Sequence, residues 1–104
     1  MEDVNRHEII GTVVDEPRFS DKSTPRLTFK VKTVRKWMQG DEERESVKIH
    51  HVVCWRDMAS KNKEKIKSGV RVSLIGPVVT NVKEEGEVKT YFTETQVDEL
   101  SVVM

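Results

Sequence analysis

The chain has 104 residues, of which 36% are hydrophobic and 35% are charged, and its formal net charge at pH 7 is zero. This length predicts one domain with one core. The zero net charge argues against a partner that is attracted by the charge of the whole molecule. No run approaches the roughly 20 apolar residues of a transmembrane helix, and no signal peptide is evident. Cys54 is the single cysteine, so we expect a reducing intracellular compartment and no internal disulfide.

The first half of the chain predicts three strands, because β-branched and apolar residues alternate with polar ones between turn-forming boundaries. The expected ranges are 7–14, 27–34 and 46–55. Gly11 interrupts the first range and indicates a bulge or a close backbone approach. Residues 15–17 are expected to end that strand, and residues 38–45 are expected to form a charged hairpin loop around Gly40.

The second half predicts a short helix followed by further strands. Residues 56–68 are rich in good helix formers, Asp57 can cap the start, and Gly69 follows the last turn as a C-cap glycine does. Strands are expected at 70–75, 78–82 and 89–97, with a hairpin loop at 83–87. This element order is that of a five-stranded Greek-key barrel, the OB-fold, with its helix between strands three and four. We therefore expect one all-β domain with one short helix, filling residues 1–104.

The sequence offers little for catalysis or metal binding. Its five glycines are isolated, so there is no phosphate-binding loop. His50, His51 and Cys54 are an incomplete ligand set, and His51 and Cys54 point to opposite faces of a strand. Cys54 lies between Val53 and Trp55, as a core thiol does, and the acids are scattered. We therefore expect no enzyme, no cofactor, no metal and no small-molecule substrate.

Cations and aromatic rings occur together in the second and third strands. Residues 26–36 hold five bases and no acid: Arg26, Lys30, Lys32, Arg35 and Lys36. Trp37 follows directly, while His51 and Trp55 share one face of the third strand. Tyr91 and Phe92 are adjacent, so one of the two points outward. Single-stranded nucleic acid needs such rings for its bases and such cations for its phosphates, so we expect these residues to bind it.

Four segments resemble the single-stranded-DNA-binding proteins of bacteria, organelles and phages. They are residues 4–17, 29–37, 50–55 and 66–76. The first carries the family's opening strand, with Asn5, alternating apolar residues, Gly11 and a turn that ends in proline. The third is similar to its His-Arg-Val-Val-apolar-Phe signature, and the fourth to its helix end and fourth strand. The resemblance extends over essentially the whole chain.

The resemblance implies an OB-fold that binds single-stranded DNA with little sequence preference, in the cytoplasm or nucleoid, during replication, recombination or repair. It also implies a homo-oligomer, with a tetramer favoured over a dimer and no membrane partner. Trp37 and Trp55 correspond to base-stacking aromatics of the family. His50 corresponds to a histidine of the subunit contacts, to which we assign Ile9 and Val13 as well.

Two departures from the family pattern predict weaker or more salt-sensitive binding. Ile49 stands where the family commonly has a tryptophan, and Lys83 stands near the place of another stacking aromatic. We retain Lys83 as a nucleic-acid contact in that hairpin. Two other functions fit the same residues: an RNA-binding OB-fold subunit, and an assembly or adaptor domain whose aromatic face is buried against protein.

Overall fold

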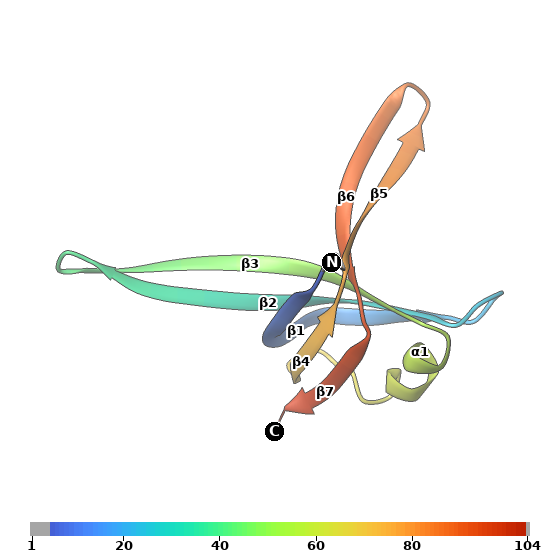
Figure 1. The fold of residues 1–104 in the computed structure, drawn as a ribbon, viewed down its shortest axis with the longest axis horizontal. Coiled ribbons are helices and arrows are strands. Elements are labelled where there is room, and N and C mark those ends of the chain that lie inside the picture. The colour runs from blue at the N-terminus through green and yellow to red at the C-terminus, as the bar shows by residue number, and fades with distance from the viewer. Residues whose placement is uncertain (1–4, 104) are drawn as a thin grey trace, which may run out of the picture.

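The structure is a computed structural model of the 104-residue chain and describes residues 5–103, apart from the side chain of Lys83. The elements are β1 (His7–Ser20), β2 (Arg26–Gln39), β3 (Glu42–Trp55), α1 (Arg56–Asn62), β4 (Arg71–Gly76), β5 (Val78–Glu85), β6 (Val88–Gln96) and β7 (Glu99–Val103). All the strands belong to one sheet, in the order β5-β6-β3-β2-β1-β4-β7 (Figure 1). No helix in residues 5–103 is long and apolar enough to cross a membrane.

The sheet curls because β1 changes partner along its length. Residues 7–12 pair with β4, while residues 12–14 and 18–20 pair with β2. The register shifts between Val14 and Arg18, where Asp15 has a φ of 60°, and a bulge of this kind bends its strand. β3 and β6 then pair in parallel over two residue pairs. The result is a half-barrel of the OB type, as the element order predicts.

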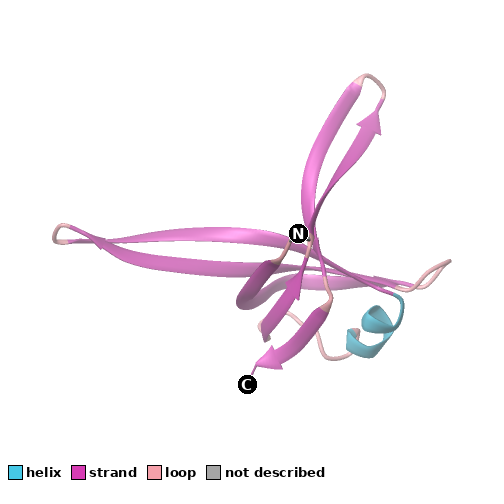
Figure 2. Ribbon diagram, in the orientation of Figure 1, coloured by secondary structure: helices cyan, strands magenta, loops and turns pink. Residues whose placement is uncertain are grey.

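The core lies inside the curl and is covered at one end by α1, which Figure 2 shows directly after β3. It contains Ile9, Val13, Leu27, Phe29, Val31, Val52, Cys54, Ala59, Ile66, Val72 and Leu74. β1, β2, β3 and β4 supply the strand residues of this core, and they come from one face of each strand because successive side chains point to opposite faces. Gly11 lies between two core positions of β1, and a Cβ there would stand 2.4 Å from the carbonyl oxygen of Lys32. The expected close backbone approach at Gly11 is confirmed.

Two hairpins extend from the half-barrel in different directions (Figure 1). β2 and β3 pair along their full lengths, but β1 follows β2 only as far as Lys32. Residues 33–48 are therefore a two-stranded ribbon, which we call the β2–β3 arm. β5 and β6 form a second ribbon, residues 78–95, which we call the β5–β6 arm.

The order of the elements is confirmed, but several expected boundaries are wrong. β1, β2 and β3 each have 14 residues. β2 and β3 are longer than expected because the charged residues 38–45 continue their ladder around a tight turn. Residues 15–17 do not end β1, which continues past the bulge to Ser20. The helix ends at Asn62, and Trp55 rather than Asp57 occupies its N-cap, without a side-chain cap hydrogen bond. β4, β5 and β6 lie where strands were expected, but β5 continues to Glu85 through most of the expected hairpin loop, and β7 is an additional strand.

Candidate nucleic-acid interface

The pleat of the β2–β3 hairpin brings most of the predicted binding residues to one face. Three cross-strand pairs define it: Arg26 with Trp55, Lys30 with His51, and Lys32 with Ile49. All six side chains are exposed, and they point away from the core, which takes the alternate residues of β2. We call this surface the outer face. Farther along the arm it continues with the exposed valines 34 and 47, and then with Lys36 opposite Glu45.

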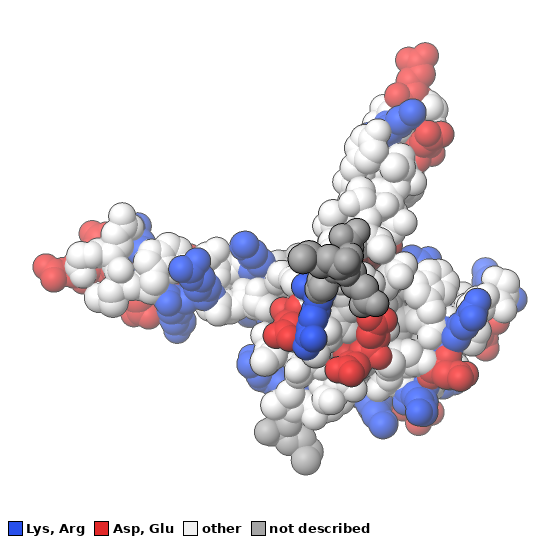
Figure 3. Space-filling view, in the orientation of Figure 1, with Lys and Arg blue, Asp and Glu red and all other residues white. Residues whose placement is uncertain are grey.

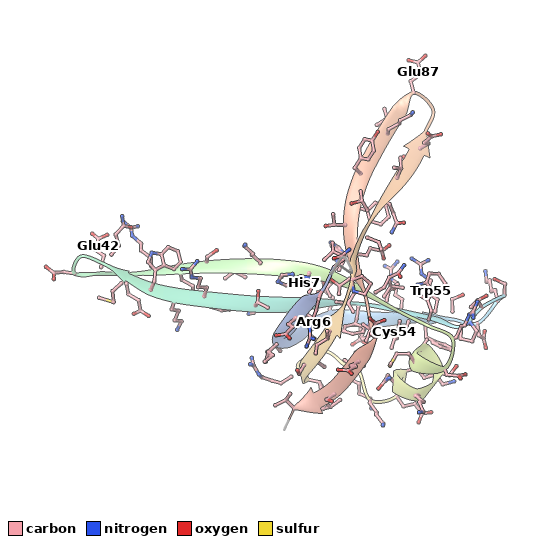
Figure 4. All side chains as sticks on the ribbon, viewed as in Figure 1. Arg6, His7, Glu42, Cys54, Trp55 and Glu87 are labelled. Carbon is pink, nitrogen blue, oxygen red and sulfur yellow. The ribbon has the colours of Figure 1, made fainter. Side chains whose placement is uncertain are left out.

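Trp55 lies at the end of the outer face nearest the barrel, where β3 ends and α1 begins (Figure 4). Its side chain is 42% exposed, and the guanidinium carbon of Arg26 is 5.3 Å from the ring centroid. Arg56 has a φ of 54°, which reverses the chain at this point, and its N–H donates to the carbonyl oxygen of Pro25 at 2.8 Å. The junction therefore holds an exposed indole next to a cation, which is the combination that a base and its phosphate require.

A groove of about 480 Å³ lies beside His51, between the bulge of β1 and the β2–β3 hairpin. Its charged lining consists of Asp15, Glu16, Arg18, Lys30 and Glu94. The Nζ of Lys30 is 3.6 Å from a carboxylate oxygen of Asp15. Both side chains are exposed, so this ion pair stabilises the fold by only about 0–1 kcal/mol. The free-energy cost of replacing Asp15 by a DNA phosphate as the partner of Lys30 is therefore small.

Trp37 and Arg35 lie on the opposite, inner face of the same arm. Trp37 pairs with Arg44 of β3 and shares its face of the ribbon. Arg44 is an odd number of positions, eleven, from Trp55, so Trp37 and Trp55 point to opposite sides. The two tryptophans are also separated by roughly 36 Å of strand, at about 3.3 Å per residue. The guanidinium carbon of Arg35 is 5.5 Å from the Trp37 ring centroid. The structure therefore does not bring the two predicted tryptophans onto one surface.

A second groove, of about 470 Å³, lies where β2 and β3 leave β1, at the unpaired edge of β2, and residues of both faces of the β2–β3 arm line it. Its lining includes Ile10, Val34, Trp37, Lys48 and His50. The side chain of Ile10 is 61% exposed. Ile10 is not among the residues predicted from the sequence, although strict alternation along β1 would have pointed it outward.

Ile9 and Val13 are only 2% and 1% exposed, because both pack in the core of their own chain. The expectation that their side chains contact another subunit is therefore wrong. Alternation along β1 points these two residues inward, and it leaves Ile10 between them as the apolar side chain at the surface.

His50 belongs to a part-buried cluster at the base of the inner face. Its Nε2 is 2.9 Å from the hydroxyl oxygen of Thr33, and its ring centroid is 5.3 Å from that of His7. The Nδ1 of His7 is in turn 2.9 Å from the hydroxyl oxygen of Thr95. Burial, followed by His7 and Lys48, lowers the pKa of His50. His50 thus favours its neutral form in the folded chain.

The β5–β6 arm carries Tyr91 and Phe92, and both rings are exposed, at 66% and 39%. The arm has two strands, and no further layer in residues 5–103 packs against either face of it. Lys83 pairs with Thr90 in the ladder of this arm. Toward the tip the charge becomes acidic, with Glu87 in the turn, and Figure 3 shows acidic side chains at the ends of both arms. The cations of the outer face lie nearer the barrel.

A curled OB-type sheet whose exposed strand face alternates cations with rings defines a class of protein that binds single-stranded nucleic acid. The family model described as the single-strand binding protein family matches residues 4–103. The chain therefore belongs to that family, and its function is to bind single-stranded DNA.

Solved structures share this fold. The chain is 19% identical to the protein in a Plasmodium falciparum SSB complex with ssDNA, with a TM-score of 0.86 over 100% of this chain and 98% of that one. It is 13% identical to the small single-stranded DNA-binding protein from Streptomyces coelicolor, with a TM-score of 0.78 over 100% and 97%. A comparison with curated proteins found no match.

Proposed function

We propose that the outer face is the surface on which this protein binds single-stranded DNA. Trp55 stacks on a base, while Arg26, Lys30 and Lys32 contact consecutive phosphates. The observation that carries this assignment is the cross-strand register, which places each of the three cations beside an aromatic or apolar side chain on one exposed face. His51 and Lys36 extend the same face on either side of Lys32.

Binding of this kind depends little on sequence and strongly on salt. Every nucleotide has a ring face and a phosphate, so stacking and phosphate contacts do not select a base. Each neutralised phosphate of a single strand contributes about −0.7 to the slope of log affinity against log salt. Three cations on the outer face therefore predict a slope of about −2. Asp15 lies beside Lys30 and Glu45 lies opposite Lys36, and these two acids oppose any further contribution.

The predicted binding residues that lie away from the outer face would contact only a longer DNA strand. Tyr91 offers a second stacking ring on the β5–β6 arm, which also carries Lys83. Trp37 and Arg35 lie on the inner face, so a strand reaches them only after it passes around the edge of β2. We therefore expect a short oligonucleotide to contact Trp55 first. A longer oligonucleotide would also reach the residues of the β5–β6 arm and of the inner face.

The inner face is the proposed contact between subunits of a homo-oligomer, with a tetramer favoured over a dimer. Residues 7–11 of β1 pair with β4 on one side only, and residues 33–39 of β2 pair with β3 on one side only. Unpaired strand edges accept a strand from another chain. Ile10 and His50 line the groove between these two edges, so we assign the contact to them in place of Ile9 and Val13.

Catalysis and cofactor binding have no part in the proposal. Burial raises the pKa of the Cys54 thiol to about 12, so this cysteine lacks the thiolate that a nucleophile needs. We place the protein in the cytoplasm or on the nucleoid, where it would cover strands exposed in replication, recombination or repair.

The test is a titration of the protein with poly(dT), followed by tryptophan fluorescence at several salt concentrations. We expect quenching, because a stacked base covers the exposed indole of Trp55, and an affinity that falls as salt rises. Absence of quenching, or an affinity that salt does not change, would refute the assignment. Competition with a matched RNA oligonucleotide separates DNA from RNA preference, and native mass spectrometry of the same samples gives the number of subunits.

A further inference from the structure

The two arms separate at a point where two histidine rings meet. β3 and β6 pair over only two residue pairs, and beyond those pairs the arms diverge (Figure 1). The hydroxyl of Thr95 on β6 contacts His7, the rings of His7 and His50 lie 5.3 Å apart, and His50 contacts the hydroxyl of Thr33 on β2. This row of four side chains connects one arm to the other through the first residue of β1, which Figure 4 places where the arms part.

The chain segment that carries His7 also holds the other strand of the β5–β6 arm. The side-chain amide of Asn5 donates to the carbonyl oxygen of Val78 at 2.9 Å, and the N–H of Val78 donates to the Asn5 oxygen at 3.3 Å. Asn5 therefore contacts the start of β5 while His7 contacts the end of β6. An isolated two-stranded hairpin is marginally stable, so the direction of this arm depends on such contacts at its base.

Among residues 5–103, no carboxylate forms an ion pair with His7 or His50 that would neutralise a second positive charge. The other ionisable groups that line the grooves on either side of His50 are Glu8, Arg35, Lys48, His51 and Glu94. Both carboxylates are engaged elsewhere: Glu8 pairs with Arg6 at 2.8 Å, and Glu94 accepts a hydrogen bond from the side chain of Asn81. Burial together with the charges of His7 and Lys48 lowers the pKa of His50. Protonation of both rings would place two cations 5.3 Å apart, and this arrangement is unfavourable.

We propose that the contact between His7 and His50 is a pH-sensitive latch for the β5–β6 arm. While at most one ring is charged, the latch holds the arm in the direction that the structure shows. When both rings are protonated, the rings separate and the arm swings about its base, where two residue pairs with β3 and the hydrogen bonds between Asn5 and Val78 remain. The barrel stays folded, because neither histidine belongs to the buried core. The latch does not depend on the assignment of the outer face.

Spin labels on the arm and on the barrel test the latch. Val88, in the arm, and Lys67, after α1, are both exposed, so each accepts a labelled cysteine. Cys54 is buried and stays unlabelled. Doubly labelled chains are diluted with unlabelled protein, and the distance between the labels is measured at about pH 7.5 and about pH 4.5. The lower value lies well below the ordinary histidine pKa because the pKa of His50 is lowered. We expect the distance distribution to shift and broaden at the lower pH.

Two variants show whether the pair causes the change. His7→Gln keeps a hydrogen-bonding side chain near Thr95 but cannot take a proton, so its distance distribution should be the same at both pH values. His51→Gln, at the third histidine of the chain, should leave the pH response intact. An unchanged distribution in the parent, an equal shift in His7→Gln, or unfolding of the barrel in the same pH step by circular dichroism would each overturn the proposal.

Discussion

Truncation of Trp55 to alanine tests the outer face most directly. The indole is 42% exposed and lies beside Arg26, so it is the ring of the outer face best placed to stack on a base. Loss of one base–aromatic stack costs about 1–3 kcal/mol. Since about 1.4 kcal/mol corresponds to a tenfold change, we expect the Kd for a short oligo(dT) to increase about 5- to 150-fold. Trp55→Phe keeps an aromatic face and should recover most of this loss.

The assay is fluorescence anisotropy of a labelled oligo(dT) at fixed low salt, with thermal unfolding of each variant to verify that it is folded. Trp37→Ala is the matched control, because this ring lies on the inner face and roughly 36 Å along the strand from Trp55. It should change the affinity for a short oligonucleotide by less than about threefold, since its stacking partner would come from a longer strand. A folded Trp55→Ala variant that binds like the parent, or equal losses for both tryptophans, would refute the placement of the first base at Trp55.

Four further outcomes follow from the structure. In Gly76→Ala, the new Cβ would lie 1.6 Å from the carbonyl oxygen of Gln96, so we expect urea melts to show a loss of about 3 kcal/mol or more. Cys54 should not react with a thiol reagent in the native protein and should react fully in denaturant, because it is buried and its thiol pKa is about 12. The pKa of His50 is lower in the folded than in the unfolded chain. The unfolded state therefore binds the proton first, and the free energy of unfolding should fall as the pH drops below about 6.5. Lys32→Gln should reduce the steepness of the salt dependence by about 0.7.

Each of these outcomes has a control in the same chain. Gly86→Asn occupies an open turn with a positive φ and should cost less than about 1 kcal/mol. Lys61→Gln, on α1, should leave the salt slope unchanged. Equal losses at Gly76 and Gly86, rapid labelling of native Cys54, or equal slopes for Lys32→Gln and the parent would contradict the corresponding argument. For His50, the contradiction would be a pH profile that His50→Gln does not flatten.

The sequence predicts the barrel well because alternation marks the strands that bury one face. Leu27, Phe29 and Val31 alternate with polar residues, and all three are in the core. The same logic fails where a strand buries neither face. Residues 38–45 are charged and their composition indicates a loop, yet they pair across a two-stranded ribbon that solvent surrounds on both sides. The sequence does not reveal β7, because a five-residue strand at the edge of a sheet carries little pattern of its own.

The binding site is predictable in part, because residues at every second position of one strand share a face. This alternation alone correctly places His51 and Trp55, four positions apart, on one face of β3. The relation between Trp37 and Trp55 is different, since it depends on the register between two strands, and a slip of one residue moves a side chain to the opposite face. The assignment of Ile9 and Val13 to a subunit contact fails because alternation along β1 turns both side chains toward the core and leaves Ile10 at the surface.

The tight turns at the ends of the two arms have a practical consequence. A Cβ added at Gly40 or at Gly86 would meet no atom within 4 Å. Exposed turns of this kind accept inserted residues, because an insertion there disturbs no packing. A short affinity tag or a dye-binding peptide can therefore be placed at either turn. Attached to a sensor surface through such a handle, the protein would keep the outer face at the base of the β2–β3 hairpin free for its ligand.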